Sequence, residues 1–309
     1  MKTKLTDELY CGINKEKLKA KLTLSSKFLK VLNWFIKERY EIHLKKDVQK
    51  LNAPWTTNEH FQKYKYTNIR REHDRESKYL IQHVSENTNL SYENKLLNSF
   101  LFRLINNHKT FEKYSFPFDF NSLNFKEISK IKIEGPIYNT AFIVTGHSSV
   151  IKKQQGDSSV LSVIKFVKSN EKQILLKSKN QLEAYNNLIK INGIGKFLAY
   201  QIFLDFTYIE EYPFSENEFT KAGPGCVKGL DLLFPDKKNL NHEELLFWLR
   251  DNQKKVFSLD FNNLFSDLKE FDKILNIGCL ENIFCEFYKY CRSEVLNSTK
   301  PKKLYKYNS

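Results

Sequence analysis

A glycine turn between two apolar segments is the first feature of the sequence that could do chemistry. Residues 188–202 read LIKINGIGKFLAYQI, and two glycines separate stretches of helical periodicity. In a helix–hairpin–helix element such glycines let backbone amides approach a DNA phosphate closely, because they lack a Cβ atom and tolerate positive φ. Gly193, Gly195 and Lys196 are therefore candidates for anchoring one DNA strand. An ordinary turn between two helices is the alternative.

Acidic residues follow this turn at positions that a base-removing enzyme could use. Asp205 lies near the end of the second helix, and Glu216 and Glu218 lie in the next loop. In DNA glycosylases built on such a hairpin, a downstream carboxylate stabilises the positive charge that develops on the sugar as the base departs. Glu218 and then Glu216 lie about where this precedent requires an acid, whereas Asp205 could instead cap or position something. A solvated surface charge is the alternative for each.

The segment 68–81, NIRREHDRESKYLI, concentrates arginines in a chain that otherwise prefers lysine. Helical spacing would place Arg71 on one face with Asp74 and Arg75. Because the planar guanidinium binds phosphate or carboxylate in a bidentate manner, Arg70, Arg71 and Arg75 are candidate phosphate ligands, and Asp74 is a further candidate acid. A helix of solvent-exposed ion pairs is the alternative.

The elements that must position these residues are mainly helical. Apolar residues at three- and four-residue spacing predict helices near 25–46, 66–84, 92–106, 182–191, 197–206, 242–250 and 280–291. Proline and glycine punctuate β-branched runs at 141–145 and 160–167, which predicts a small hairpin or irregular insert at 116–169. We expect a single mainly α domain of 1–309, with two lobes at roughly 1–115 and 170–300 around that insert.

The composition favours a nucleic-acid partner. Fifty lysines and arginines against 36 acidic residues give a net charge of +14, a balance expected of a protein that neutralises phosphates. A lysine-rich surface encoded by an AT-rich genome is the alternative. The hydrophobic share of 41% is enough for a proper core.

Several classes of protein are disfavoured. The five cysteines form no CxxC pair and the seven histidines form no HExxH motif, so neither a disulfide framework nor a zinc site is indicated. We expect no metal and no cofactor. Without an apolar leader or a long apolar run, we expect a cytoplasmic monomer with no membrane segment.

Six ordered segments carry a resemblance to a known family. They are PWT at 54–56, YKYTNIRREHDRESKYLI at 64–81, FLFRLIN at 100–106, GIGKFLAYQIFLDFTY at 193–208, SENEFTKAGPG at 215–225 and ENIFCEFYKYCR at 281–292. They resemble the alpha-glutamyl/putrescinyl-thymine pyrophosphorylase family, also described as the helical domain of hydroxymethyluracil DNA kinases. The resemblance implies an all-helical enzyme, related to helix–hairpin–helix DNA glycosylases, that acts on modified thymine or cytosine in double-stranded phage DNA.

The resemblance also implies site residues. A pocket for an extruded base would be formed by Trp55, Asn68, Tyr200, Gln201, Gly223, Pro224 and Gly225. Lys289 and Arg292 would join the phosphate ligands, and Glu286 also matches the pattern. This chain has Asn217 and Glu218 where the family pattern leads us to expect two aspartates.

Three functions remain open from the sequence. The leading hypothesis is a DNA glycosylase that flips out and excises a hypermodified pyrimidine, such as glucosylated hydroxymethylcytosine, in antiviral defence. In it, Glu218 or Asp205 positions a water while Arg71 and Arg75 contact the modification or a phosphate. The alternative is an amino-acid:DNA transferase that displaces pyrophosphate from activated hydroxymethyluracil. The third is a DNA-binding module without catalysis. The kinase P-loop motif GxxxxGK[ST] does not occur in the sequence.

Overall fold

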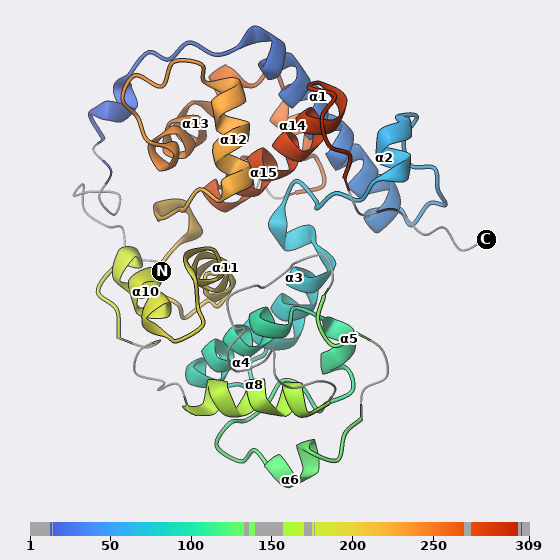
Figure 1. Cartoon of the computed structure of the whole chain (residues 1–309), viewed down its shortest axis with the longest axis vertical. Coiled ribbons are helices and arrows are strands. Elements are labelled where there is room, and N and C mark those ends of the chain that lie inside the picture. Colours follow the sequence, from blue (N-terminus) through green and yellow to red (C-terminus); the bar gives the residue numbers. More distant parts are fainter. Residues whose placement is uncertain are drawn as a thin grey trace. The chain divides into compact units, whose positions relative to one another are not determined.

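The computed structural model describes residues 13, 15–132, 136–139, 157–169, 175, 177–268, 273–301 and 304. The chain forms two compact units (Figure 1). Unit 1 comprises Met1–Asp7 and Arg75–Phe219, and unit 2 comprises Glu8–Asp74 and Thr220–Ser309. This division differs from the expected lobes, because the middle of the chain forms one unit and the segments on either side of it form the other.

The regular secondary structure of unit 1, in its described residues, consists of helices and helical turns. Its elements are α3 (Arg75–Leu80), a π-helical turn (Ile81–Ser85), α4 (Tyr92–Ile105), α5 (His108–Phe111), α6 (Phe125–Ile128), α8 (Asp157–Ser169), α10 (Gln181–Lys190), α11 (Lys196–Phe206) and a 3-10 turn (Glu216–Glu218). The central helix is α4, which packs against both α8 and α11. Ser91 caps its first turn by accepting a hydrogen bond from the Asn94 amide.

The β-branched run at 160–167 was expected in a small hairpin or irregular insert, and for this segment the prediction is wrong. It lies in α8, where Val160, Val163, Ile164 and Val167 are all fully buried. Their spacing of three, one and three residues places them on one helical face, so packing against α4 overrides the β preference of valine and isoleucine. The other expected β-branched run, 141–145, lies outside the described residues.

Unit 2 contains most of the remaining helices. Its elements are a 3-10 turn (Lys17–Lys19), α1 (Ser26–His43), a π-helical turn (Leu44–Val48), α2 (Glu59–Lys63), a 3-10 turn (Arg71–His73), α12 (Pro224–Leu233), α13 (His242–Val256), α14 (Phe261–Leu264) and α15 (Ile277–Glu294). Its described residues also contain two isolated β-bridges, which pair Thr23 with Asp236 and Tyr64 with Leu304. The mainly α prediction is confirmed.

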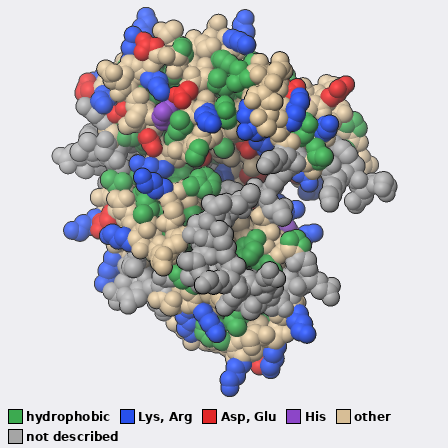
Figure 2. Space-filling view, in the orientation of Figure 1, with side chains coloured by type: hydrophobic (Ala, Val, Ile, Leu, Met, Phe, Trp, Pro, Cys, Tyr) green, Lys and Arg blue, Asp and Glu red, His purple; other side chains and the backbone are tan. Residues whose placement is uncertain are grey.

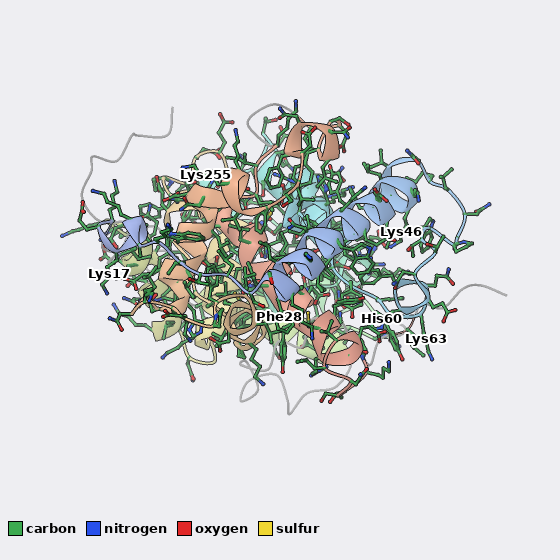
Figure 3. All side chains as sticks on the ribbon, turned by 90° about the horizontal axis from the view of Figure 1, so that it is seen from above. Lys17, Phe28, Lys46, His60, Lys63 and Lys255 are labelled. Atoms are coloured by element: carbon green, nitrogen blue, oxygen red, sulfur yellow. The ribbon has the colours of Figure 1, made fainter. Side chains whose placement is uncertain are left out.

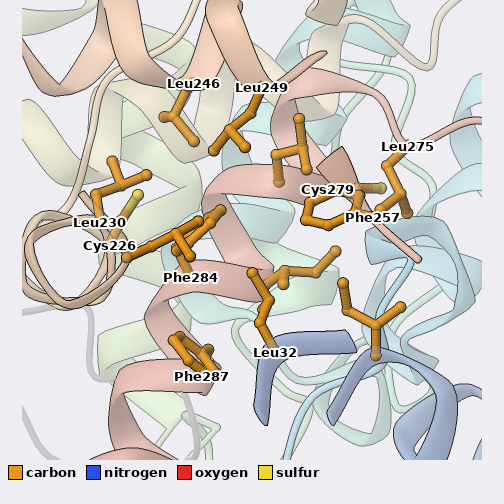
Figure 4. Close-up of a cluster of buried hydrophobic side chains, with 14 of the residues drawn as sticks. Leu32, Cys226, Leu230, Leu246, Leu249, Phe257, Leu275, Cys279, Phe284 and Phe287 are labelled. Carbon is orange, nitrogen blue, oxygen red and sulfur yellow. The ribbon is translucent and has the colours of Figure 1, made fainter. Parts of the chain in front are cut away.

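The core of unit 2 forms where α12 crosses α15 (Figure 4). Gly229 allows the close approach, because a Cβ atom at this position would collide with the Phe284 carbonyl oxygen. Buried leucines and phenylalanines from α1, α12, α13 and α15 fill the surrounding space. In Figure 3, α1 extends from Phe28 towards Lys46, and its Trp34 ring stacks on Phe61 of α2. Helix α15 is therefore a fixed element of the core.

The charged segment near 66–84 does not form the single helix that its spacing predicts. Arg70 and Asp74 have extended backbones on either side of the 3-10 turn, and α3 begins at Arg75. The Asn68 amide donates to Asp74 Oδ1 at 2.9 Å, and Asn68 Nδ2 donates to the His73 carbonyl at 2.9 Å. These local side-chain bonds close a loop over 68–74 in place of a helical turn.

Lysine and arginine side chains occur across the face seen in Figure 2 and do not gather in one patch there. Within the described residues, no helix is long and apolar enough to cross a membrane.

Candidate functional site

One face of α15 carries polar side chains that hold the 65–68 segment. Glu286 Oε2 accepts a hydrogen bond from the Thr67 amide at 3.1 Å. Asn282 accepts from Thr67 Oγ1 at 3.2 Å and donates to the Asn68 carbonyl at 3.0 Å. Lys289 Nζ donates to the Lys65 carbonyl at 2.8 Å. The loop that presents Asn68, Arg71 and Asp74 is thereby fixed against the core helix of unit 2.

Asp74 is an acid whose protonation changes near neutral pH. Burial raises its pKa from 3.8 to about 7, and the negative charge of Glu286 adds to this. The Asn68 amide and the positive charges of Arg71 and Arg39 oppose the rise. A carboxyl group in this state can both accept and release a proton at physiological pH.

Glu281 is a second acid of the same kind, on α15. Burial raises its pKa from 4.5 to about 7, while the Gly223 amide and the charge of Arg71 oppose the rise. The Gly223 amide donates to Glu281 Oε1 at 3.1 Å, and Gly223 is the N-cap residue of α12. Glu281 therefore faces the amino end of α12, where the helix dipole favours negative charge.

Arg71 links the two acids. Its side chain is buried, and its positive charge acts on both Asp74 and Glu281. Two carboxyl groups with pKa values near 7 and one guanidinium make a set that could transfer protons and stabilise an anion. We call Asn68, Arg71, Asp74, Glu281 and Glu286 the carboxyl cluster.

Several predicted site residues belong to this cluster or touch it. Asn68, Arg71 and Asp74 are members, Gly223 donates to Glu281, and Lys289 donates to Glu286 Oε2 at 2.9 Å. Sequence analysis assigned these residues to three different roles: lining a base pocket, binding phosphate and acting as a catalytic acid. The structure brings them together in unit 2.

Other predicted residues of unit 2 have contacts of their own. Arg70 is buried and donates to Glu72 Oε1 at 2.6 Å and to the Ile274 carbonyl at 3.2 Å, which indicates a structural role. Trp55 is half-buried and donates to the Leu51 carbonyl at 2.7 Å. Pro224 is exposed at the start of α12.

Gly225 and Arg292 complete the predicted residues of unit 2. Gly225 packs on α15, where an added Cβ atom would lie 2.6 Å from the Cys285 sulfur. Arg292 is half-buried, and its Nε atom has no hydrogen-bond partner among the described residues.

The predicted acids of unit 1 are held by neighbouring side chains. Asp205 is fully buried and accepts hydrogen bonds from Arg103 Nε and Nη2, both at 2.6 Å. Glu218 is half-buried and accepts a hydrogen bond from Gln181 Nε2, and Glu216 shares its 3-10 turn. The Arg103 guanidinium is thus the buried counter-charge of the Asp205 carboxylate.

The glycine turn lies where the sequence predicts it. It joins α10 to α11, and Gly193 has a φ of 87°, in the left-handed region that favours glycine. Gly195 caps α11, and nothing lies within 4 Å of the position of its missing Cβ atom. Lys196 is exposed beside it. The backbone of the turn is thus open to a ligand.

The remaining predicted residues of unit 1 differ in exposure. Tyr200 and Gln201, which follow the turn in α11, are buried. The Arg75 side chain is 70% exposed and pairs with Glu76 at 2.9 Å. Exposure leaves Arg75 accessible to a phosphate, whereas Tyr200 and Gln201 face the interior.

Sequence reasoning missed Arg39, Glu281 and Asn282. Arg39 follows Phe35 and Ile36 by four and three residues, so it occupies the apolar stripe of α1 rather than its charged face. Glu281 interrupts the buried apolar face of α15, whereas Asn282 lies on the polar face with Glu286. A charged residue at a position that periodicity assigns to the core is the signal that could have found Arg39 and Glu281. Among the described side chains, no cluster of three histidine, cysteine or acidic residues could hold a metal ion.

Comparison with known proteins supports the resemblance. Residues 26–300 match the family model described as "5-hmdU DNA kinase, helical domain". The chain is 27% identical over 276 residues to the 5-hmdU DNA kinase of Bacillus phage SP10, covering 82% of this chain and 43% of that protein. The chain thus spans less than half the length of this relative. No solved structure matches it significantly. The chain belongs to the family of helical domains found in 5-hmdU DNA kinases.

Proposed function

We propose that this protein catalyses a base-directed transfer on modified phage DNA, in which an amine displaces pyrophosphate from an activated 5-hydroxymethyluracil. The observation that carries the proposal is the carboxyl cluster, where two acids with pKa values of about 7 share the charge of Arg71. Membership of a family named for a 5-hydroxymethyl-deoxyuridine DNA kinase supports a modified uracil as the target. It favours modification over base excision, which was our leading expectation from the sequence.

The reaction needs one proton acceptor and one anion-binding group. The amine nitrogen forms a bond to the methylene carbon of the base, and the carbon–oxygen bond to pyrophosphate breaks with its electrons passing to the leaving oxygen. The proton lost by the nitrogen passes to a carboxylate, for which Asp74 or Glu281 is suited, because each is partly ionised near pH 7. The Arg71 guanidinium would stabilise the negative charge that develops on pyrophosphate.

The acids of unit 1 suit this chemistry less well. Both carboxylate oxygens of Asp205 are already engaged in a bidentate pair with Arg103. Glu218 is held by Gln181. We therefore assign the chemistry to the carboxyl cluster and assign DNA contact in unit 1 to the Gly193–Gly195 turn, with Lys196 and Arg75 as additional phosphate ligands. The target base must leave the duplex before it can react.

The test uses duplex DNA that carries pyrophosphorylated hydroxymethyluracil at one position. The protein is incubated with this DNA and a mixture of amino acids and diamines, and the nucleosides are analysed by mass spectrometry while released pyrophosphate is measured. We expect a nucleoside that has gained the amine, with loss of pyrophosphate. Release of a free modified base would support excision instead, and unchanged DNA would overturn both enzymatic readings.

Variants identify the working residues. Asp74→Asn or Glu281→Gln, whichever removes the proton acceptor, should slow the transfer by roughly 10²- to 10⁴-fold, the usual contribution of general acid–base catalysis. Asp251→Asn, an exposed acid on α13 that pairs with Arg250, should leave the rate unchanged and is the matched control. Full activity in both cluster variants would exclude the carboxyl cluster as the catalytic site.

A further inference from the structure

Arg39 is a buried cation with an unusual set of contacts. Only 1% of its surface is exposed. Its Nη2 atom donates to the Tyr66 carbonyl at 3.1 Å and to the Thr67 carbonyl at 3.2 Å. The guanidinium carbon lies 5.4 Å from the centre of the Phe61 ring and 5.7 Å from that of Tyr66. One side chain of α1 thereby fixes the backbone immediately before Asn68.

The charge of Arg39 is incompletely compensated. Its Nε and Nη1 atoms are buried and have no hydrogen-bond partner among the described residues. A buried charge is normally paired, because removing it from water is costly. In surroundings of low polarity, an unpaired charge acts strongly on nearby ionisable groups. The groups on which the Arg39 charge acts include Asp74 and Tyr66.

The groups that face Asp74 come from three elements. Arg39 lies on α1, Arg71 on the 3-10 turn and Glu286 on α15, and the Asn68 amide donates directly to the Asp74 carboxyl group. Glu286 disfavours the carboxylate form of Asp74, whereas both arginines favour it. Glu286 also accepts a hydrogen bond from the Thr67 amide, and the carbonyl group of the same residue accepts one from Arg39. Arg39 therefore acts on the backbone and on the charge of the same loop.

We propose that Arg39 is a positioning residue for Asp74, because its buried guanidinium fixes the 66–67 backbone of the loop that presents Asp74. The catalytic consequence rests on the proposed function, whereas the effect on Asp74 does not. Loss of the Arg39 charge should raise the pKa of Asp74 further, because one of the positive charges that oppose burial and Glu286 would be removed.

The direct test is titration of Asp74 in the full chain. Carboxyl carbons of aspartate are labelled with ¹³C, the Asp74 signal is identified by its loss in Asp74→Asn, and its chemical shift is followed from pH 4 to 9. The wild-type midpoint is expected at about 7. The midpoint should rise in Arg39→Gln and stay near the wild-type value in Lys37→Gln, an exposed lysine on the same helix. An unchanged midpoint in folded Arg39→Gln would overturn the proposal.

Arg39→Lys separates charge from shape and serves also if Arg39→Gln fails to fold. Lysine keeps the positive charge but lacks the planar fork of arginine. We expect an Asp74 midpoint close to that of the wild type, together with faster hydrogen exchange at the Thr67 amide. A midpoint in Arg39→Lys well above the wild-type value, or unchanged exchange at Thr67, would overturn the proposal. In the transfer assay, the pH at half-maximal rate should rise in Arg39→Gln, whereas the maximal rate should persist. If the protein shows no transfer activity but Asp74 titrates as expected, only the proposed function is refuted.

Discussion

Replacing Asp205 with asparagine tests whether this acid has a structural role. Asp205 is fully buried and accepts hydrogen bonds from Arg103 Nε and Nη2, both at 2.6 Å. Asparagine keeps the size of the side chain but removes its charge, so the buried Arg103 guanidinium loses its counter-charge. Removing one partner of a buried pair costs about 3–5 kcal/mol, and we expect Asp205→Asn to lower the free energy of unfolding by an amount in this range.

Urea unfolding followed by circular dichroism measures this change. The matched variant is Arg103→Met combined with Asp205→Leu, which removes both charges and fills the space with apolar side chains. Since well-packed apolar replacements of buried pairs are often neutral or stabilising, the double variant should regain most of the stability lost in Asp205→Asn. Glu127→Gln, in an exposed pair with Lys130 at 3.0 Å, should leave the midpoint nearly unchanged.

The reasoning about Asp205 would be refuted by one combination of results. If Asp205→Asn unfolds at the same urea concentration as the wild type and yet abolishes activity on modified DNA, the carboxylate acts in catalysis. Asp205 would then be a catalytic acid, as the sequence analysis considered for it and for Glu218. The bidentate pair with Arg103 would have to open during the reaction.

Two further predictions concern α15 and the glycines. Because burial raises the pKa of Glu281 from 4.5 to about 7, this carboxyl contributes most stability when protonated, below pH 4.5, and loses it as the pH rises through 7. The free energy of unfolding of Glu281→Gln, relative to that of the wild type, should therefore be roughly 2–3 kcal/mol higher at pH 8 than at pH 5. Urea unfolding at both pH values measures this change, and an equal difference at both would contradict the assigned pKa. Gly229→Ala should destabilise unit 2 by about 1–3 kcal/mol, because the new Cβ atom meets the Phe284 carbonyl, whereas Gly195→Ala has open space and should change little. Thermal melts compare the two, and equal melting temperatures would contradict the close packing of α12 on α15.

Periodicity predicted most long helices well. The expected helices at 182–191 and 197–206 correspond to α10 (Gln181–Lys190) and α11 (Lys196–Phe206), and the glycine turn lies between them. The helix expected near 92–106 is α4, which ends where Asn106 adopts a left-handed φ of 51°. These elements were predictable because one apolar stripe and one terminating residue define each of them.

The failures have local and tertiary causes. The predicted helix near 66–84 is broken because Asn68 bonds to Asp74 and to the His73 carbonyl, an arrangement that spacing cannot reveal. The 160–167 segment was expected in a hairpin or irregular insert, but its valines and isoleucine also fit a helical face, and packing against α4 selects the helix.

The candidate site was predictable only in part. Arg71 and Asp74 were identified from the charged segment 68–81, and Asn68 and Gly223 were identified through a resemblance to a known family. Glu281 was missed because its raised pKa depends on burial against the amino end of α12, which no local pattern shows. The grouping of these residues required the fold, since unit 2 combines two segments that lie more than one hundred residues apart in the chain.

The most direct test of the proposed function is a single-turnover reaction with excess protein and duplex DNA carrying one pyrophosphorylated hydroxymethyluracil. Pyrophosphate release and incorporation of labelled amine are measured in the same sample, along with strand cleavage by alkali. The proposal predicts one pyrophosphate released for each amine incorporated, with strands that resist alkali, and a loss of both products in Asp74→Asn or Glu281→Gln. Alkali-labile abasic sites and a free modified base, without amine incorporation, would contradict it and identify the protein as a DNA glycosylase.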